Sequence, residues 1–327
     1  MENCIFVVME TVEGAVKNVG LEMLTPAKEI AAAKGTKVAA VVIGEGVGEA
    51  AKAAAAYGAD VVITVDDAAY KTYASDEYAS VLTELVKKYN PEVVLIGATQ
   101  NGKDFAPRTA VKLNTGCASD VTAMKLNADG KVAFTCPVYG GTILAENVVE
   151  TLPQMATVRG GAFKKGEMTD AAAEVIAETV AVDAAAVKTR IVDVVKEISE
   201  SVNLEDAEII VAGGRGMGSA ENFALVKELA DVLGGVVGAT RAPIEAGWIS
   251  RAYQIGQSGK IVAPKLYIAC GVSGATQHVT GMMGSDYIVA INKDEDAPIF
   301  DIANVGIVGN VLQVIPEMIA EIKKMKA

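Results

Sequence analysis

The sequence predicts an α/β protein built on parallel β-sheets and divided into two domains. Short β-branched runs alternate with helical segments in both halves of the chain. The first four runs are almost continuously apolar, which is typical of strands buried on both faces of a parallel sheet. A length of 327 residues suits about two domains. We expect one domain over residues 1–200 and a second over residues 201–327.

The first domain opens with three β-α-β units. The pattern predicts strands over residues 5–9, 37–43, 61–65 and 93–96, and helices over 21–34, 47–57, 76–88 and 104–113. Gly35, Gly58 and the pair Asn90-Pro91 follow three of these helices and are helix stop signals. This alternation indicates a Rossmann-like parallel sheet in the N-terminal domain.

The pattern changes after residue 113. Strands are predicted over residues 121–126, 132–137, 142–149 and 154–158, with short turns over 127–130 and 139–141. Because such turns join antiparallel strands, we expect the sheet to gain antiparallel members here. A strand-like run over residues 191–195 comes shortly before the expected domain boundary.

The second domain also alternates strands with helices. It begins with a strand over residues 209–211, a glycine-rich turn over 213–219 and a helix over 220–233. Further strands are predicted over residues 236–239, 266–270, 287–292 and 299–302, and a last helix over 310–324. The glycine spacing is GxGxG and departs from the GxGxxG dinucleotide fingerprint, so tight packing explains these glycines as well as phosphate binding does.

Composition argues against several classes of protein. The net charge of −12 repels nucleic acid and anionic lipid surfaces. The four cysteines are far apart in the sequence, without the close pairs that zinc and iron–sulfur sites need. No run reaches the roughly 18 apolar residues of a membrane span. No basic or Arg-rich leader begins the chain, so we expect a cytoplasmic protein without membrane insertion.

Polar residues and glycines gather between Thr240 and Asn292, at the ends of predicted strands. Open α/β sheets bind ligands at the carboxyl ends of their strands. Ser273 and Gly274 come just before a helical stretch over residues 276–283, whose first backbone N–H groups attract an anion. A phosphate-bearing ligand fits this region best.

His278 and Trp248 are each the only residue of their type in the chain. A lone histidine is more often a hydrogen-bonded structural residue than a catalytic one. A single tryptophan is more often a core or interface residue than a ligand contact. Residue type alone therefore assigns neither side chain to a site.

Several long motifs follow one another in the second half of the chain. They are Gly213-Gly214-Arg215-Gly216, residues 237–241, residues 254–264, residues 266–281 and Ala290-Ile291-Asn292. In their order and spacing these motifs closely resemble the alpha subunit of electron-transfer flavoproteins. Residues 97–104 and Ala106-Pro107-Arg108 are similar to the N-terminal domain of that family. The resemblance covers essentially the whole chain.

The resemblance implies that the second domain binds FAD and that the chain pairs with a beta subunit to relay electrons. It places Arg241 beside the isoalloxazine ring, Ser258 at flavin N5 and His278 at the O2 side. A cation at about 4 Å stabilises the anionic reduced ring by up to roughly 4 kcal/mol at an effective dielectric constant near 20. The implied FAD contacts are Arg215, Thr240, Arg241, Arg251, Ile255, Gly256, Gln257, Ser258, Ser273, Gly274, Ala275, Thr276, Gln277, His278, Asn292, Asn310 and Val311. Ser258 and Asn310 stand where the family more often has Thr and Asp.

Residues 243–253, which include Arg251, resemble anaerobic bacterial members of the family that take electrons from NADH and bifurcate them. In those members a second FAD lies in the beta subunit. The resemblance implies an acyl-CoA dehydrogenase, such as butyryl-CoA dehydrogenase, as one partner. It implies ferredoxin or flavodoxin as another, reached through the beta-subunit flavin. Arg251 near the alpha-subunit flavin would raise its reduction potential.

Three alternatives stay open at this point. One is a conventional single-FAD carrier that accepts electrons from acyl-CoA dehydrogenases. Another is a stand-alone FAD- or NAD-dependent oxidoreductase, which needs a substrate pocket with a proton-transfer residue. A third is a nucleotide-binding scaffold without a redox role.

Overall fold

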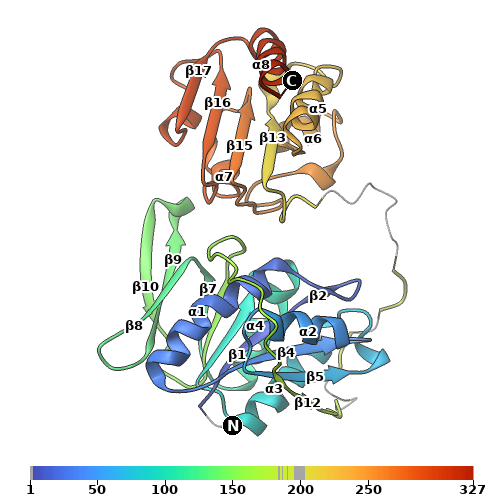
Figure 1. Cartoon of the computed structure of the whole chain (residues 1–327), viewed down its shortest axis with the longest axis vertical. Coiled ribbons are helices and arrows are strands. Elements are labelled where there is room, and N and C mark those ends of the chain that lie inside the picture. The colour runs from blue at the N-terminus through green and yellow to red at the C-terminus, as the bar shows by residue number, and fades with distance from the viewer. Residues whose placement is uncertain (1–2, 183–184, 186, 190, 195–202, 327) are drawn as a thin grey trace. The chain divides into compact units, whose positions relative to one another are not determined.

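The computed structural model describes residues 3–182, 185, 187–189, 191–194 and 203–326. The chain divides into two compact units, residues 1–195 and 196–327. Each unit is α/β and contains its own parallel sheet, as the sequence predicts (Figure 1). None of the helices in these described ranges combines the length and the apolar character needed to cross a membrane.

The first unit is built on a seven-stranded sheet in which all paired strands are parallel. Its order is β12-β5-β4-β1-β6-β11-β7. The central strand β1 (Ile5–Met9) is buried along its whole length. The other strands are β4 (Val38–Gly44), β5 (Val61–Asp66), β6 (Val93–Gly97), β7 (Cys117–Val121), β11 (Gln154–Val158) and β12 (Glu174–Ala177).

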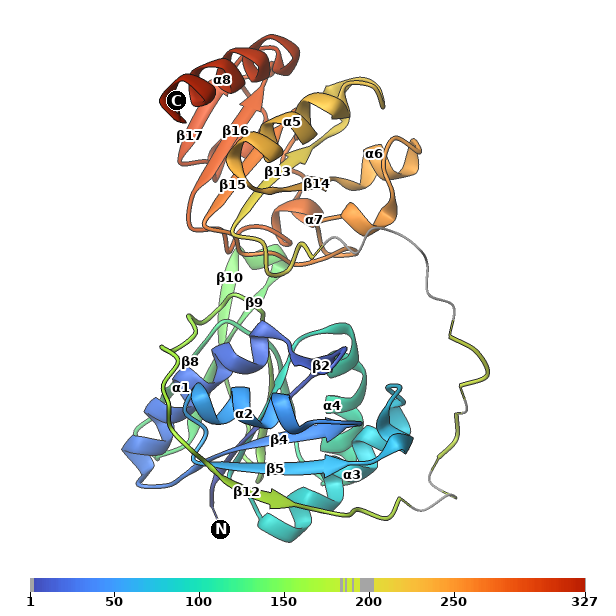
Figure 2. The same cartoon turned by 45° about the vertical axis from the view of Figure 1, so that its right-hand side comes forward.

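Helices cover both faces of this sheet (Figure 2). Residues of α1 (Asn18–Lys34) and α2 (Gly48–Ala56) share one core with Ile5 and Val7. Residues of α3 (Ser75–Tyr89) and α4 (Gln100–Lys112) share the opposite core with alternate residues of β1. Alternate side chains of a strand point to opposite faces, so β1 belongs to both cores.

The fourth helix, α4, begins four residues earlier than predicted. The Thr99 hydroxyl caps it by accepting a hydrogen bond from the Gly102 N–H over 3.0 Å. A side chain at Gly102 would bring a Cβ to 1.8 Å from the Gly97 carbonyl oxygen, so this turn of helix packs on β6 only with glycine there.

The expectation of antiparallel strands within the main sheet was wrong. Strands β8 (Ala123–Leu126), β9 (Val132–Val138) and β10 (Ile143–Val148) form a separate antiparallel sheet, while β11 enters the main sheet in parallel. The predicted strand over 121–126 is broken at residue 122, because Val121 still pairs with Val158 in the main sheet while Ala123 already pairs with Thr135 in the antiparallel sheet.

The sequence pattern also failed to predict other short elements. The hairpin of β2 (Thr11–Val12) and β3 (Ala15–Val16) and the exposed edge strand β12 have only two, two and four residues, too few for a strand pattern to be recognised. No strand covers residues 191–194, and residue 195 of that prediction lies outside the described residues.

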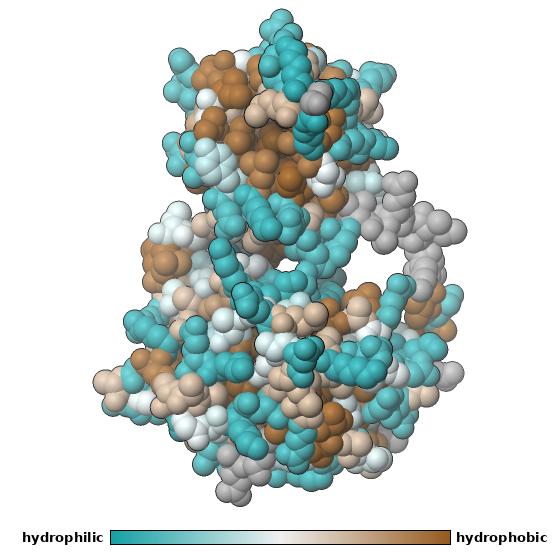
Figure 3. Space-filling model, viewed as in Figure 1, coloured by the Kyte–Doolittle hydropathy of each residue, from teal (hydrophilic) through white to brown (hydrophobic). Residues whose placement is uncertain are grey.

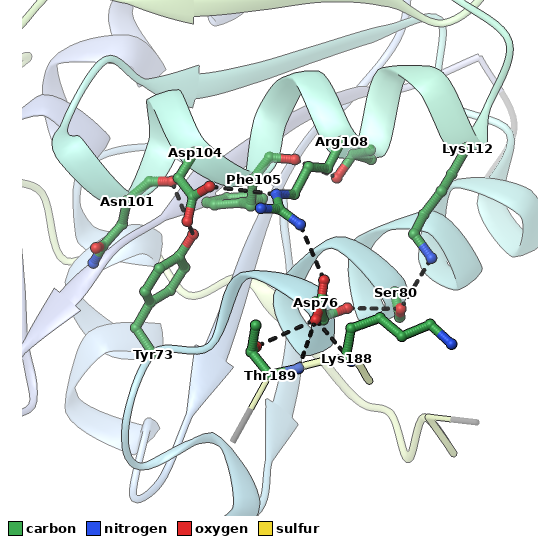
Figure 4. Close-up of polar contacts among 11 residues, drawn as sticks. Tyr73, Asp76, Ser80, Asn101, Asp104, Phe105, Arg108, Lys112, Lys188 and Thr189 are labelled. Carbon is green, nitrogen blue, oxygen red and sulfur yellow. Dashed lines mark hydrogen bonds and ion pairs between the residues drawn. The ribbon is translucent and has the colours of Figure 1, made fainter. Parts of the chain in front are cut away.

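A carboxylate anchors the last described part of the first unit (Figure 4). Asp76, in the first turn of α3, accepts hydrogen bonds from the backbone N–H groups of Lys188 and Thr189 over 2.9 and 3.1 Å. The Thr189 hydroxyl and Arg108 of α4 also contact it, over 3.2 and 3.1 Å. These contacts, led by the Lys188 backbone hydrogen bond, lower the pKa of Asp76. They tie residues 188–189 to two helices.

The second unit is built on a five-stranded parallel sheet of order β14-β13-β15-β16-β17. Helices α5 and α8 pack on one of its faces. The strands are β13 (Ile209–Gly213), β14 (Val236–Ala239), β15 (Leu266–Cys270), β16 (Ile288–Asn292) and β17 (Val305–Val308). The helices are α5 (Phe223–Leu233), α6 (Arg241–Glu245), α7 (Thr276–Val279) and α8 (Val311–Lys326).

The predicted strand over 299–302 was wrong. Residues Pro298–Asp301 form a 3-10 helix, and the edge strand β17 follows it. Ile299 is fully buried, so its apolar signal is that of a core residue in a turn. Pro298 at the first helical position favours this conformation because its φ is already helical.

Candidate functional site

A cavity of about 700 Å³ lies in the second unit, at the carboxyl ends of the strands. This volume is within the range of small-molecule and cofactor pockets. Most of the predicted site residues line it. They are Arg215, Thr240, Arg241, Ile255, Gly256, Gln257, Ser258, Ser273, Ala275, Gln277, His278, Asn292, Asn310 and Val311.

Parallel pairing explains why residues far apart in the sequence meet here. Arg215 follows β13, Thr240 follows β14 and Ser273 comes soon after β15. Asn292 ends β16 and Asn310 comes soon after β17. Since all five strands run in one direction, these residues lie at a single edge of the sheet.

Two loops at this edge touch through glycine backbone. The Gly216 N–H donates a hydrogen bond to the Gly271 carbonyl over 2.9 Å. A Cβ at Gly216 would lie 2.7 Å from the Cα of Gly271. Of the glycines in the turn over 213–219, Gly214 and Gly216 are therefore required for packing at the cavity rim.

Three predicted residues do not line the cavity. Gly274, with a φ of +89°, packs against the 3-10 helix, and a Cβ there would lie 2.2 Å from the Ile299 nitrogen. Thr276 is exposed at the start of α7. Arg251 is exposed on the 3-10 helix Arg251–Tyr253. Gly274 and Thr276 adjoin the lining residue Ala275 within one motif, whereas the prediction of Arg251 rests on the resemblance of residues 243–253 to bifurcating members of a family.

Other residues line the cavity without having been predicted as contacts. Gln254 is buried, and its Nε2 donates to the Ser258 hydroxyl over 3.0 Å. Lys293 and Asp294 follow Asn292 directly, and Glu245 lies one helical turn after Arg241. Helical i,i+4 spacing is the only sequence signal that could have indicated Glu245.

The cavity has a mixed charge. Its lining includes the cations Arg215, Arg241 and Lys293 and the carboxylates Glu245 and Asp294. Arg241 Nε donates to Glu245 Oε1 over 2.6 Å, and both side chains are well exposed, at 71% and 61%. The excess of cations favours an anionic ligand.

Backbone donors at the rim also suit an anion. Ser273 and Ala275 line the cavity, and within the described part of the chain no acceptor contacts the backbone N–H group of either residue. Unpaired N–H groups beside cations bind phosphate oxygens well. The donor set therefore fits a phosphate-bearing cofactor.

His278 is held between two internal partners. Its Nδ1 lies 3.0 Å from the Ile255 carbonyl oxygen and its Nε2 lies 2.9 Å from the Tyr267 hydroxyl. A carbonyl only accepts, so Nδ1 carries the proton and Nε2 accepts from the phenol. Burial lowers the pKa of His278 to about 4, although the Ile255 hydrogen bond opposes the shift. The ring is neutral at pH 7, and a hydrogen bond to a ligand would require one partner to be released.

The described residues provide neither a reactive thiol nor a set of metal ligands. Cys4, Cys136 and Cys270 are buried and Cys117 is half-buried, and none of the four forms a disulfide. Burial raises the pKa of Cys4 and Cys117 to about 11 and that of Cys270 to about 12. Those described residues contain no group of three or more His, Cys, Asp and Glu side chains able to hold a metal ion.

Comparison with known proteins identifies two family domains in the chain. Residues 5–186 match the electron transfer flavoprotein domain, and residues 203–283 match the electron transfer flavoprotein FAD-binding domain. The electron transfer flavoprotein subunit alpha of Thermoanaerobacterium thermosaccharolyticum is 46% identical over 98% of both chains. The same-named protein of Megasphaera elsdenii is 45% identical over 98% of this chain and 97% of its own.

A third relative carries a different name. The acryloyl-CoA reductase electron transfer subunit beta of Anaerotignum propionicum is 39% identical over 98% of this chain and 96% of its own. Both domain matches agree with the two α/β units, and these relatives are covered almost completely. The chain therefore belongs to the electron transfer flavoprotein family, as an alpha subunit.

Proposed function

We propose that the cavity of the second unit binds FAD and that the chain acts as one half of a heterodimer with a beta subunit. The cavity carries this proposal, because its lining combines cations, amide side chains and unpaired backbone N–H groups at the carboxyl ends of five parallel strands. This chemistry suits a dinucleotide with two phosphates and a hydrogen-bonding ring.

Each part of the lining has a defined task in this proposal. Arg215 and the backbone N–H groups of Ser273 and Ala275 bind the pyrophosphate. Ser258, oriented by Gln254, presents its hydroxyl to the ring, and Arg241 supplies a positive charge beside it. Bound FAD supplies reversible uptake and release of electrons, so the chain itself needs no nucleophile.

Exposed apolar side chains in the first unit support a subunit partner. Tyr139, Ile143 and Leu144 are 80%, 53% and 65% exposed, at and beside β10. Hydrophobic residues gather over this strand (Figure 3). Exposed apolar patches of this kind commonly mark protein interfaces. In the proposal, they contribute to contact with the beta subunit.

We further propose a cytoplasmic relay between NADH and an acyl-CoA dehydrogenase, such as butyryl-CoA dehydrogenase. Electrons from NADH would enter through a second FAD in the beta subunit, with ferredoxin or flavodoxin as the other acceptor in a bifurcating reaction. The segment around Arg251 and the name of the acryloyl-CoA reductase relative support this proposal.

The deciding experiment is co-expression with the beta subunit, followed by quantification of the nucleotides released on denaturation. Two FAD per heterodimer are expected for NADH-driven bifurcation. One FAD with one AMP would indicate a conventional single-flavin carrier. A heterodimer without FAD would overturn the assignment of the cavity.

A kinetic test addresses the stand-alone oxidoreductase. The purified chain loaded with FAD alone is expected to show no turnover with NADH or an acyl-CoA, whereas the heterodimer with its dehydrogenase does. Turnover by the isolated chain would contradict a role as a carrier subunit.

A further inference from the structure

Arg241 and Glu245 form an ion pair at the edge of the cavity. They are the first and last residues of α6, which places them one helical turn apart. Arg241 Nε and Glu245 Oε1 are 2.6 Å apart, and both residues line the cavity. The same carboxylate that contacts the arginine therefore also faces the ligand.

The ion pair between Arg241 and Glu245 contributes little to the stability of the fold. The two side chains are 71% and 61% exposed, and exposed ion pairs contribute little to stability. The helix they belong to has only five residues, and its buried residue is Pro243, which the substitution leaves in place. Removing the carboxylate is therefore expected to leave the unit folded.

The pair has a direct electrostatic consequence for the cavity. An isolated cation stabilises negative charge over a long range, but a carboxylate beside it cancels much of that field. No second carboxylate within the described ranges pairs with Arg241. Glu245 is thus the residue that controls how much of the arginine charge the cavity contents experience.

We propose that Glu245 is the counter-ion that limits the effect of Arg241 on the reduction potential of the bound flavin. This inference rests on the proposed function, in which Arg241 lies beside the FAD ring. Reduction adds negative charge to the ring, so a less compensated Arg241 raises the potential. Glu245 consequently holds that potential below the value that the arginine alone would set.

The test uses the FAD-loaded heterodimer and the substitution Glu245→Gln, which removes the charge and keeps the size of the side chain. At low ionic strength and pH 7, we expect the reduction equilibrium to shift tenfold or more toward the reduced form, about 30 mV for two electrons. The shift should shrink at high salt because an exposed pair is screened, which a packing defect would not do.

Glu321→Gln is the matched control. Glu321 pairs with Lys324 on α8 over 2.6 Å and is similarly exposed, but it does not line the cavity. Its substitution is expected to leave the potential unchanged. The substitution Arg241→Gln should lower the potential, and the double variant should return close to the wild-type value because both opposing charges are gone.

The outcomes distinguish failure of the inference about Glu245 from failure of the proposed function. If the wild-type heterodimer holds FAD and Glu245→Gln leaves the potential unchanged or lowers it, this inference is overturned while the proposed function stands. If the wild-type heterodimer holds no FAD, the proposed function fails and the inference fails with it. A salt-sensitive rise in Glu245→Gln that is absent in Glu321→Gln would support it.

Discussion

The phenol of Tyr267 donates a hydrogen bond to Nε2 of His278 over 2.9 Å inside the second unit. The opposite ring nitrogen, Nδ1, donates to the Ile255 carbonyl. Both aromatic side chains are buried, and Tyr267 lies on β15 while His278 lies on α7. The two bonds fix one neutral tautomer of the histidine and hold α7 against the sheet.

We predict that His278 does not gain a proton between pH 8 and pH 5.5. Because it is the only histidine, its ring protons can be followed by NMR without assignment of others. The expected pKa is about 4, owing to burial. Tyr267→Phe should raise this pKa, since a donor to the neutral ring is lost, whereas Tyr287→Phe, at an exposed site, should not. A wild-type pKa near the ordinary value of about 6.5 would contradict the buried neutral ring.

The lowered pKa of His278 predicts that the stability of the second unit depends on pH. Its folded pKa of about 4 lies below its unfolded value, so the unfolded state binds more protons between about pH 6.5 and pH 4. Stability of the second unit should therefore fall as the pH is lowered through this window, by up to about 3 kcal/mol from this group. Urea unfolding at several pH values measures the slope. In His278→Gln the slope should be shallower, and identical slopes would refute this contribution.

Gly274 is expected to tolerate no side chain. Gly274→Ala combines a left-handed φ of +89° with a Cβ placed 2.2 Å from the Ile299 nitrogen, so the loop over the cavity must move. Gly234→Ala is the control, because Gly234 has a φ of +74° and open space around its Cβ. It should lose only the roughly 1–2 kcal/mol of left-handed strain. The unfolding temperature and the FAD content should both fall further in Gly274→Ala than in Gly234→Ala. Equal losses in the two variants would show that the steric contact at Gly274 is unimportant.

Asp76→Ala should release residues 188–189 from the first unit. It leaves the backbone N–H groups of Lys188 and Thr189 without their acceptor, at an expected cost of about 2 kcal/mol in unfolding free energy. Limited proteolysis should also cut faster near these residues. Glu84→Ala, which removes an exposed ion pair from the same helix, should stay within about 0.5 kcal/mol of wild type. Equal protease sensitivity of both variants would argue against the anchor.

Arg251→Ala is expected to lower the reduction potential of the bound flavin, but by less than Arg241→Ala. Both arginines are exposed, yet only Arg241 lines the cavity, and Coulomb interactions weaken with distance and solvent. Spectroelectrochemical titration of the FAD-loaded heterodimer measures both variants. Unchanged one-electron potentials in Arg251→Ala would remove the electrostatic role proposed for this residue in bifurcation.

The sequence predicted the parallel cores well because their signals are local. Strand β1 and strand β15 are uninterrupted apolar runs, and their predicted bounds match the structure. The predictions failed where an apolar residue is buried outside a strand and where a strand is very short. Ile299 is buried in a 3-10 helix, and the four-residue edge strand β12 was missed. A hydrophobic pattern reports burial more directly than it reports backbone geometry.

For the candidate site, the amino-acid pattern alone predicts the alternation of strands and turns that brings Arg215, Ser273 and Asn292 to one edge of a parallel sheet. That Arg251 lies outside the cavity lining and Glu245 within it is known only from the folded chain. The same holds for the neutral tautomer of His278. The succession of strands and turns along the chain follows from local patterning, whereas the neighbours of a side chain depend on segments that are distant in sequence and meet only in the folded protein.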